Sequence, residues 1–108
     1  MGLLRAAPSA AVAGPTFTRV RVAGHELLLS RLSDGTPVAF GTTCGHEAQP
    51  LTFGVLDRDQ VDCPHHHYRY DPRTGGNTFP GDASDRPIEV YAVHEEDGWV
   101  WVDPRARP

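Results

Sequence analysis

From Thr16 onward the chain is built of short apolar or alternating segments, and Gly, Pro or Asp interrupts them every few residues. Clear examples are FTRVRV (17–22), PVAFGT (37–42) and WVWV (99–102). Alternation of apolar and polar residues predicts half-buried strands, and the interrupting residues predict the turns between them. No segment shows the period of an amphipathic helix over a useful length. We therefore expect an all-β fold, a small antiparallel β sandwich or barrel.

The turn signals group the expected strands into a three-stranded start, a middle hairpin with a short strand after it, and a final hairpin. The final hairpin turns at EEDG (95–98), and its two tryptophans, Trp99 and Trp101, should pack on one face of the last strand. The expected strands are 17–22, 26–32, 37–42, 54–57, 60–63, 68–71, 88–94 and 99–102.

Residues 1–15 differ in composition from the rest of the chain. They contain two prolines and an early Arg, and they lack a continuous apolar run of the length that a secretory signal needs. We therefore expect a flexible N-terminal arm over 1–15 and one domain over 16–108, which is long enough to bury one modest core. No stretch approaches the apolar length of a membrane span. A cytoplasmic protein without a membrane partner is the expectation.

The charge pattern excludes one class of partner. The net charge is −4, and every one of the ten basic residues is Arg, with no Lys in the chain. Nucleic acid binding requires a concentrated positive face, which this composition does not provide. An acidic surface favours a basic protein partner instead.

Two cysteines, each followed closely by histidine, are the candidate metal ligands. Cys44 is followed by Gly45 and His46, and Cys63 begins the run CPHHHY, in which His66 lies three residues after it. The hairpin between the two motifs should return the chain to the same end of the sheet, so two thiolates and two imidazoles can converge. Such donors suit zinc or an iron–sulfur cluster. A disulfide with incidental histidines is the remaining interpretation.

The pattern Cys-x-His, sixteen intervening residues, Cys-x-x-His resembles the binding motif of Rieske [2Fe–2S] proteins. The resemblance extends to Pro64 after the second cysteine, to the aromatic residues Tyr68 and Tyr70, to Leu51 after the first motif, and to FPGDASDRP (79–87), which is similar to the family's proline loop. It covers nearly all of residues 16–103.

This resemblance implies one [2Fe–2S] cluster per chain, held by two loops that the proline loop covers. It implies that Cys44 and Cys63 bind one iron and that His46 and His66 bind the other. Pro64, Pro80 and Tyr70 would lie near the cluster without binding it, and in high-potential relatives a tyrosine at the position of Tyr70 donates a hydrogen bond to a cysteine sulfur. His65 and His67 would be neighbouring or surface groups.

The function implied by the resemblance is that of a soluble, monomeric Rieske ferredoxin. Such a protein carries single electrons from an NAD(P)H-dependent, flavin-containing reductase to a terminal oxygenase, either a monooxygenase or a ring-hydroxylating dioxygenase, and has no substrate site of its own. Glu47 and the run PGDA (80–83) are similar to ferredoxins of diiron monooxygenases that act on toluene, alkenes or isoprene. Two alternatives stay open: a small Rieske-like subunit of a larger redox enzyme such as nitrite reductase, and a redox or metal sensor. His25 and His94 are isolated in the sequence and are expected to be exposed.

Overall fold

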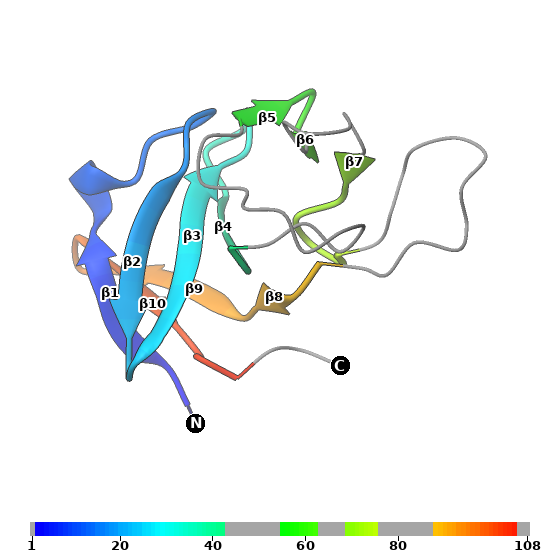
Figure 1. Cartoon of the computed structure of the whole chain (residues 1–108). Helices are drawn as coiled ribbons and strands as arrows, with labels where there is room; N and C mark the ends of the chain where they lie inside the picture. Colours follow the sequence, from blue (N-terminus) through cyan, green and yellow to red (C-terminus); the bar gives the residue numbers. More distant parts are fainter. Residues whose placement is uncertain (1, 43–54, 63–68, 76–87, 106–108) are drawn as a thin grey trace.

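The computed structural model describes residues 2–42, 55–62, 69–75 and 88–105 (Figure 1). In these residues the chain forms three antiparallel sheets and one short 3₁₀ turn, and none of the sheets closes into a barrel. The prediction of a small antiparallel all-β fold is therefore confirmed. The elements are β1 (Leu4–Pro8), η1 (Ser9–Ala11), β2 (Thr18–Val22), β3 (His25–Arg31), β4 (Pro37–Phe40), β5 (Val55–Asp57), β6 (Gln60–Asp62), β7 (Arg69–Tyr70), β8 (Val90–Tyr91), β9 (Val93–Glu96) and β10 (Trp99–Val102).

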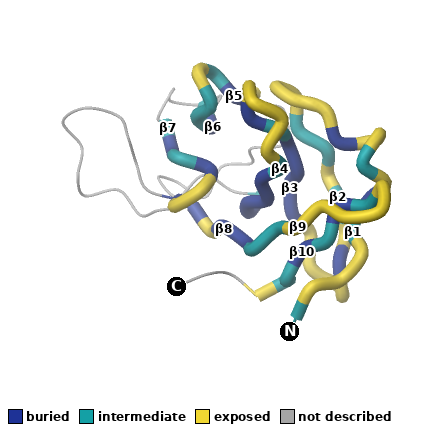
Figure 2. Tube along the Cα trace, turned by 180° about the vertical axis from the view of Figure 1, so that it is seen from behind, coloured by how far each residue is buried: buried dark blue, intermediate teal, exposed yellow. Residues whose placement is uncertain are grey.

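The three sheets form three layers. The strand order β2–β3–β4–β8 defines the central sheet, β1–β10–β9 the terminal sheet, and β5–β6–β7 the small sheet. One apolar cluster fills the space between the central and terminal sheets and contains Leu27, Leu29 and Val100. A second cluster lies between the central and small sheets and contains Leu28 and Val61. The central sheet is therefore covered on both faces, as the buried colouring of β3 and β4 in Figure 2 shows.

Burial on both faces explains the composition of β3. Four consecutive residues of this strand, Leu27 to Ser30, are fully buried. Strands covered on both faces are apolar without alternation, whereas strands covered on one face alternate. The hydroxyl of Ser30 donates a hydrogen bond to the carbonyl oxygen of Thr16 at 2.8 Å, which satisfies the one polar side chain in this run.

The N-terminal segment is ordered as a strand, so the flexible arm predicted over 1–15 is wrong at β1. This strand pairs with β10, with Arg5 opposite Trp101, and Ala7 is buried between the sheets. The guanidinium of Arg5 lies 4.7 Å from the ring centroid of Trp99 and 5.4 Å from that of Trp101. β1 pairs with the edge of β10 that β9 leaves open, and Arg5 packs on the two tryptophan rings. Tertiary contacts therefore order a segment whose own sequence does not predict a strand.

The segment 88–94, which we predicted as one strand, divides between two sheets. β8 pairs with β4 of the central sheet, whereas β9 pairs with β10 of the terminal sheet. Ala92 lies between the two strands, and its carbonyl oxygen accepts a hydrogen bond from the N–H of Asp103 at 3.0 Å. The final hairpin itself is confirmed, and it turns at Asp97 and Gly98, which both have positive φ (55° and 80°). Within the described residues no helix is long and apolar enough to cross a membrane.

Candidate metal centre

The predicted ligands fall into two of the three internal segments that the structure does not describe. Cys44 and His46 lie in 43–54, and Cys63 and His66 lie in 63–68. Pro64 and Pro80, which the resemblance places near the cluster, also lie outside the described residues, in 63–68 and 76–87. What the structure describes is the point at which each of these segments leaves the sheets and returns to them.

The small sheet holds both ends of 63–68. Asp62 at the end of β6 is the cross-strand partner of Arg69 at the start of β7. The guanidinium of Arg69 also forms an ion pair with the carboxylate of Asp57 at 2.5 Å, which ties β7 across the sheet to β5. A segment whose ends are paired in this way returns to its starting point.

The central sheet holds the start of 43–54 and lies beside the end of 76–87. After β4, the N–H of Gly41 donates a hydrogen bond to the carbonyl oxygen of Glu89 at 2.8 Å. The small sheet receives the other end of 43–54, because Val55 pairs with Asp62. Segment 43–54 therefore connects the central sheet to the same end of the small sheet from which 63–68 leaves.

The ends of 76–87 are hydrogen-bonded to each other. The N–H of Ile88 donates to the carbonyl oxygen of Gly75 at 3.0 Å, and Gly75 in turn donates to the carbonyl oxygen of Asp71, just after β7, at 2.6 Å. All three segments thus leave and re-enter the fold in one neighbourhood. We call the described residues at these ends the site base: Gly41, Asp62, Arg69, Gly75 and Ile88.

Tyr70 is the one candidate site residue within the described part of the chain. It lies in β7, opposite Val61, and its side chain is fully buried. It belongs to the apolar cluster between the central and small sheets, together with Phe40 and Ile88. The hydroxyl is therefore carried on the strand that follows 63–68, within the protein rather than at its surface.

The donor set of the chain fits a Rieske cluster. Both of its cysteines and four of its six histidines lie in 43–54 and 63–68. Thiolates and imidazoles are the two ligand types that a Rieske [2Fe–2S] cluster requires. Among the described residues no group of three or more His, Cys, Asp or Glu side chains could hold a metal ion. His25 and His94 are exposed as predicted, and the Nε2 atom of His94 lies 2.8 Å from Glu96 Oε1.

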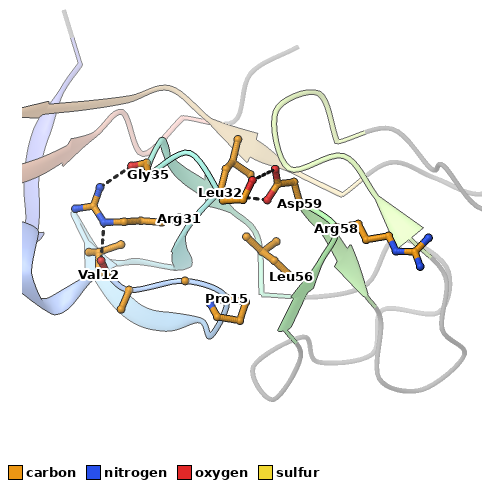
Figure 3. A pocket seen from close by; sticks show the side chains of 11 residues that line it. Val12, Pro15, Arg31, Leu32, Gly35, Leu56, Arg58 and Asp59 are labelled. Atoms are coloured by element: carbon orange, nitrogen blue, oxygen red, sulfur yellow. Dashed lines mark hydrogen bonds between the residues drawn. The ribbon is translucent and has the colours of Figure 1, made fainter.

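An open cavity of about 680 Å³ lies away from the site base, and no sequence motif predicted it. It is lined by the 12–15 segment, the β3–β4 turn and the β5–β6 turn (Figure 3). The side chains of Arg31, Ser33 and Asp59 in its lining are engaged within the protein. Arg31 donates to the carbonyl oxygens of Val12 and Gly35, and the carboxylate of Asp59 accepts from the N–H and hydroxyl of Ser33 at 2.7 and 2.8 Å. The cavity therefore lies where the segment 12–15, the central sheet and the small sheet meet.

Comparisons with known proteins agree with the resemblance to Rieske proteins. The family model of the Rieske [2Fe-2S] domain matches residues 3–94. Among curated proteins, the chain is 34% identical over 89 residues to "Toluene-4-sulfonate monooxygenase system iron-sulfur subunit TsaM1" of Comamonas testosteroni, covering 76% of this chain and 26% of that protein. The match to "Oxidoreductase NdmD" of Pseudomonas putida has 29% identity and covers 73% of this chain but 14% of that protein. The chain thus spans about a quarter or less of these relatives.

Two solved structures match over almost the whole of both chains. One is the Sphingomonas yanoikuyae B1 ferredoxin, with 31% identity, a TM-score of 0.79, and coverage of 94% of this chain and 97% of that one. The other is the ferredoxin of carbazole 1,9a-dioxygenase from Nocardioides aromaticivorans IC177, with 27% identity, a TM-score of 0.81, and coverage of 97% and 100%. A ferredoxin bound to its oxygenase in carbazole 1,9a-dioxygenase is also similar, with a TM-score of 0.82 at 27% identity, covering 99% of this chain and 97% of that one.

Proposed function

Because the chain belongs to the family of Rieske [2Fe–2S] domains, we propose that it is an electron carrier between a flavin-containing NAD(P)H reductase and a terminal oxygenase. The observation that supports this role is the match in fold to two ferredoxins, at 31% and 27% identity, each covered to 97% or more. A carrier of this kind has no substrate of its own. It is monomeric and cytoplasmic, and it meets each of its two partners in turn.

The cofactor of the domain is a [2Fe–2S] cluster, and we assign its ligands from the resemblance of the two motifs to those of Rieske proteins. Cys44 and Cys63 bind one iron, and His46 and His66 bind the other. When bound, such a cluster accepts and releases one electron, and its imidazole ligands raise its potential above that of an all-thiolate cluster. The cysteines must be deprotonated and the imidazoles neutral to bind, so cluster binding depends on pH. Because a metal site is rarely preformed in an unfolded chain, cluster binding is also coupled to the folding of the segments that carry the ligands, 43–54 and 63–68.

The described residues support this role by fixing and shielding the ligand segments. The site base holds the ends of those segments on the central and small sheets by the hydrogen bonds and pairings given above. The apolar cluster around Tyr70 lies directly beneath β7 and excludes water from that side. A dry, ordered base lowers the reorganisation that accompanies a change of charge at the site.

A second candidate is a Rieske domain that works inside a longer oxygenase chain. It is favoured by the curated relatives, in which the matching region makes up 26% or less of the whole protein. In that case the electron would pass to an iron centre in the same chain or assembly, and the domain would form a permanent interface. Gel filtration with candidate partners separates the two, because a carrier elutes alone and a subunit elutes with its partner.

The test of the carrier role uses the purified full chain. We expect two irons and two acid-labile sulfides per chain, a Rieske-type EPR spectrum after reduction with dithionite, and reduction by NADH when a flavin-containing ferredoxin reductase of a dioxygenase system is added. Stoichiometric zinc without sulfide would contradict the cluster. A cluster that dithionite reduces but NADH and reductase leave oxidised would contradict the shuttle while leaving the cluster in place.

A further inference from the structure

The turn that follows β7 ends at a glycine in a conformation that other residues rarely adopt. Asp71 begins this turn, and its carbonyl oxygen accepts hydrogen bonds from the N–H groups of Thr74 and Gly75 at 3.3 and 2.6 Å. Its side chain also accepts from the N–H of Arg73 at 2.9 Å. Gly75 closes the turn with a φ of +81°. This value favours glycine, because a Cβ is disfavoured at positive φ.

Gly75 is also packed against the chain on the far side of 76–87. A Cβ atom at Gly75 would lie 2.3 Å from the carbonyl oxygen of Ile88 and 3.4 Å from Val90 Cγ1. Real Cβ atoms do not approach a backbone oxygen so closely, and neither the turn nor Ile88 can yield cheaply, because Ile88 is buried in the core. The hydrogen bond from the Ile88 N–H to Gly75 O depends on this approach.

This contact lies where the small sheet meets the central sheet. On one side, the Gly75 turn follows directly from β7 and Tyr70. On the other side, Ile88 is followed by Glu89, whose carbonyl oxygen accepts a hydrogen bond from the N–H of Gly41, two residues before 43–54. A side chain at Gly75 would therefore change the spacing between the ends of 76–87 and, through Glu89, the place at which the first ligand segment begins.

We propose that Gly75 is a positioning residue for the cluster: its lack of a side chain lets the two ends of 76–87 meet and so sets the geometry of the ligand-bearing segments. The inference rests on the proposed ligand assignment. A residue with this role alters the potential and the spectrum of the cluster while the sheets stay folded. A residue with a general structural role alters the stability of the whole domain instead.

The test compares Gly75→Asn with Gly24→Asn in the full, cluster-loaded chain. Gly24 has nearly the same φ, +82°, but nothing lies within 4 Å of a Cβ built there. Asn tolerates positive φ better than most residues, so the pair isolates the contact with Ile88 from backbone strain. We expect Gly75→Asn to shift the reduction potential and to broaden the EPR lines of the reduced cluster. A chelator should bleach the visible absorption of this variant several-fold faster than that of the wild type. Gly24→Asn should match the wild type in all three measurements.

The remaining outcomes of this experiment also support or contradict the proposal. A Gly75→Asn protein that lacks iron but keeps the wild-type far-UV circular dichroism still supports a positioning role. A Gly75→Asn protein with wild-type potential and EPR spectrum overturns it, as does one that loses its β-sheet signal or one whose changes Gly24→Asn reproduces. A wild-type protein without iron and sulfide would instead overturn the proposed function, whatever the variants do.

Discussion

Tyr70 brings a phenol hydroxyl into an apolar layer. Its side chain is fully buried and packs in one cluster with Phe40, Ile88 and Val90. A buried hydroxyl is costly unless it is hydrogen-bonded, so a tyrosine at such a place needs a polar partner. The resemblance to high-potential Rieske proteins supplies one, a cysteine sulfur of the cluster, whereas burial excludes a hydroxyl that is merely solvated.

Changing Tyr70 to Phe should lower the reduction potential. A hydrogen bond to a ligand sulfur stabilises the extra negative charge of the reduced cluster, and such charge-assisted bonds contribute about 1.5–3 kcal/mol. For a one-electron couple this corresponds to roughly 60–130 mV. Protein-film voltammetry measures the difference, with Tyr91→Phe as the control, because Tyr91 lies in the other apolar cluster. Equal potentials for Tyr70→Phe and the wild type would show that this hydroxyl does not act on the cluster.

Only one histidine of the triplet, His66, has the Cys-x-x-His spacing of an iron ligand. His66→Ala should yield a colourless protein, because it removes an iron ligand, whereas His65→Ala and His67→Ala should keep the visible spectrum of the cluster. The two neighbouring variants serve as matched controls, since each also removes one imidazole from the same run. A red-brown His66→Ala protein beside a colourless His67→Ala protein would place the ligand one residue further along.

At the scale of the elements, Arg31 at the end of β3 joins parts of the chain that are far apart in sequence. Its guanidinium donates to the carbonyl oxygens of Ser9, Val12 and Gly35, and it also binds both carboxylate oxygens of Glu95. The hydrogen bonds from the Arg31 guanidinium, with a smaller contribution from the Ser9 side chain, lower the pKa of Glu95 from 4.5 to about 2. A lowered carboxyl pKa means that this contribution to stability is fully present above about pH 4.5 and is lost as the pH falls toward 2.

Arg31→Lys should therefore destabilise the protein more than Glu95→Gln does. A lysine keeps the charge but has no planar fork with which to reach three carbonyl oxygens, and the loss should be about 2 kcal/mol at neutral pH. Glu95→Gln removes the charge of the partner and leaves those three bonds in place. Thermal unfolding at pH 7, followed by circular dichroism, orders the two variants. An equal or greater effect of Glu95→Gln would assign the stabilisation to the ion pair.

Local signals predicted the hairpins, but they could not predict which sheet each strand joins. The turn at Asp97 and Gly98 follows from residues that accept positive φ, so EEDG marked it in the sequence. The division of 88–94 and the pairing of β1 with β10 depend on which strand edges are open, and neighbouring residues do not encode that. At the candidate site, the resemblance to the Rieske motif implied the ligand assignment, which stays a prediction, whereas the close approach of Gly75 to Ile88 joins residues with no shared motif.

At the scale of the whole molecule, the position of the acidic residues matters for docking as well as the net charge of −4. In the acidic run Glu95 to Asp97, the carboxylate of Glu95 forms an ion pair with Arg31, and that of Glu96 lies beside the ring of His94. Figure 1 shows the β9–β10 turn next to η1 and away from β7 and β8. Glu89 is exposed beside the site base, where its Oε1 atom accepts a hydrogen bond from the Tyr91 hydroxyl at 3.4 Å. The acidic residues Glu47, Asp82 and Asp85 lie outside the described residues.

Electron transfer to the oxygenase or from the reductase should therefore slow as salt is added, because salt screens the attraction between this acidic surface and a basic partner. Glu89→Gln and Asp97→Asn each remove one negative charge, the first beside the site base and the second at the distant β9–β10 turn, where Asn accepts the positive φ of Asp97. Stopped-flow rates at low and high ionic strength should show a lower rate and a flatter salt dependence for Glu89→Gln, whereas Asp97→Asn should behave as the wild type. Rates that stay flat with salt in the wild type would contradict electrostatic docking, and equal effects of the two variants would show that net charge matters rather than its position at the site base.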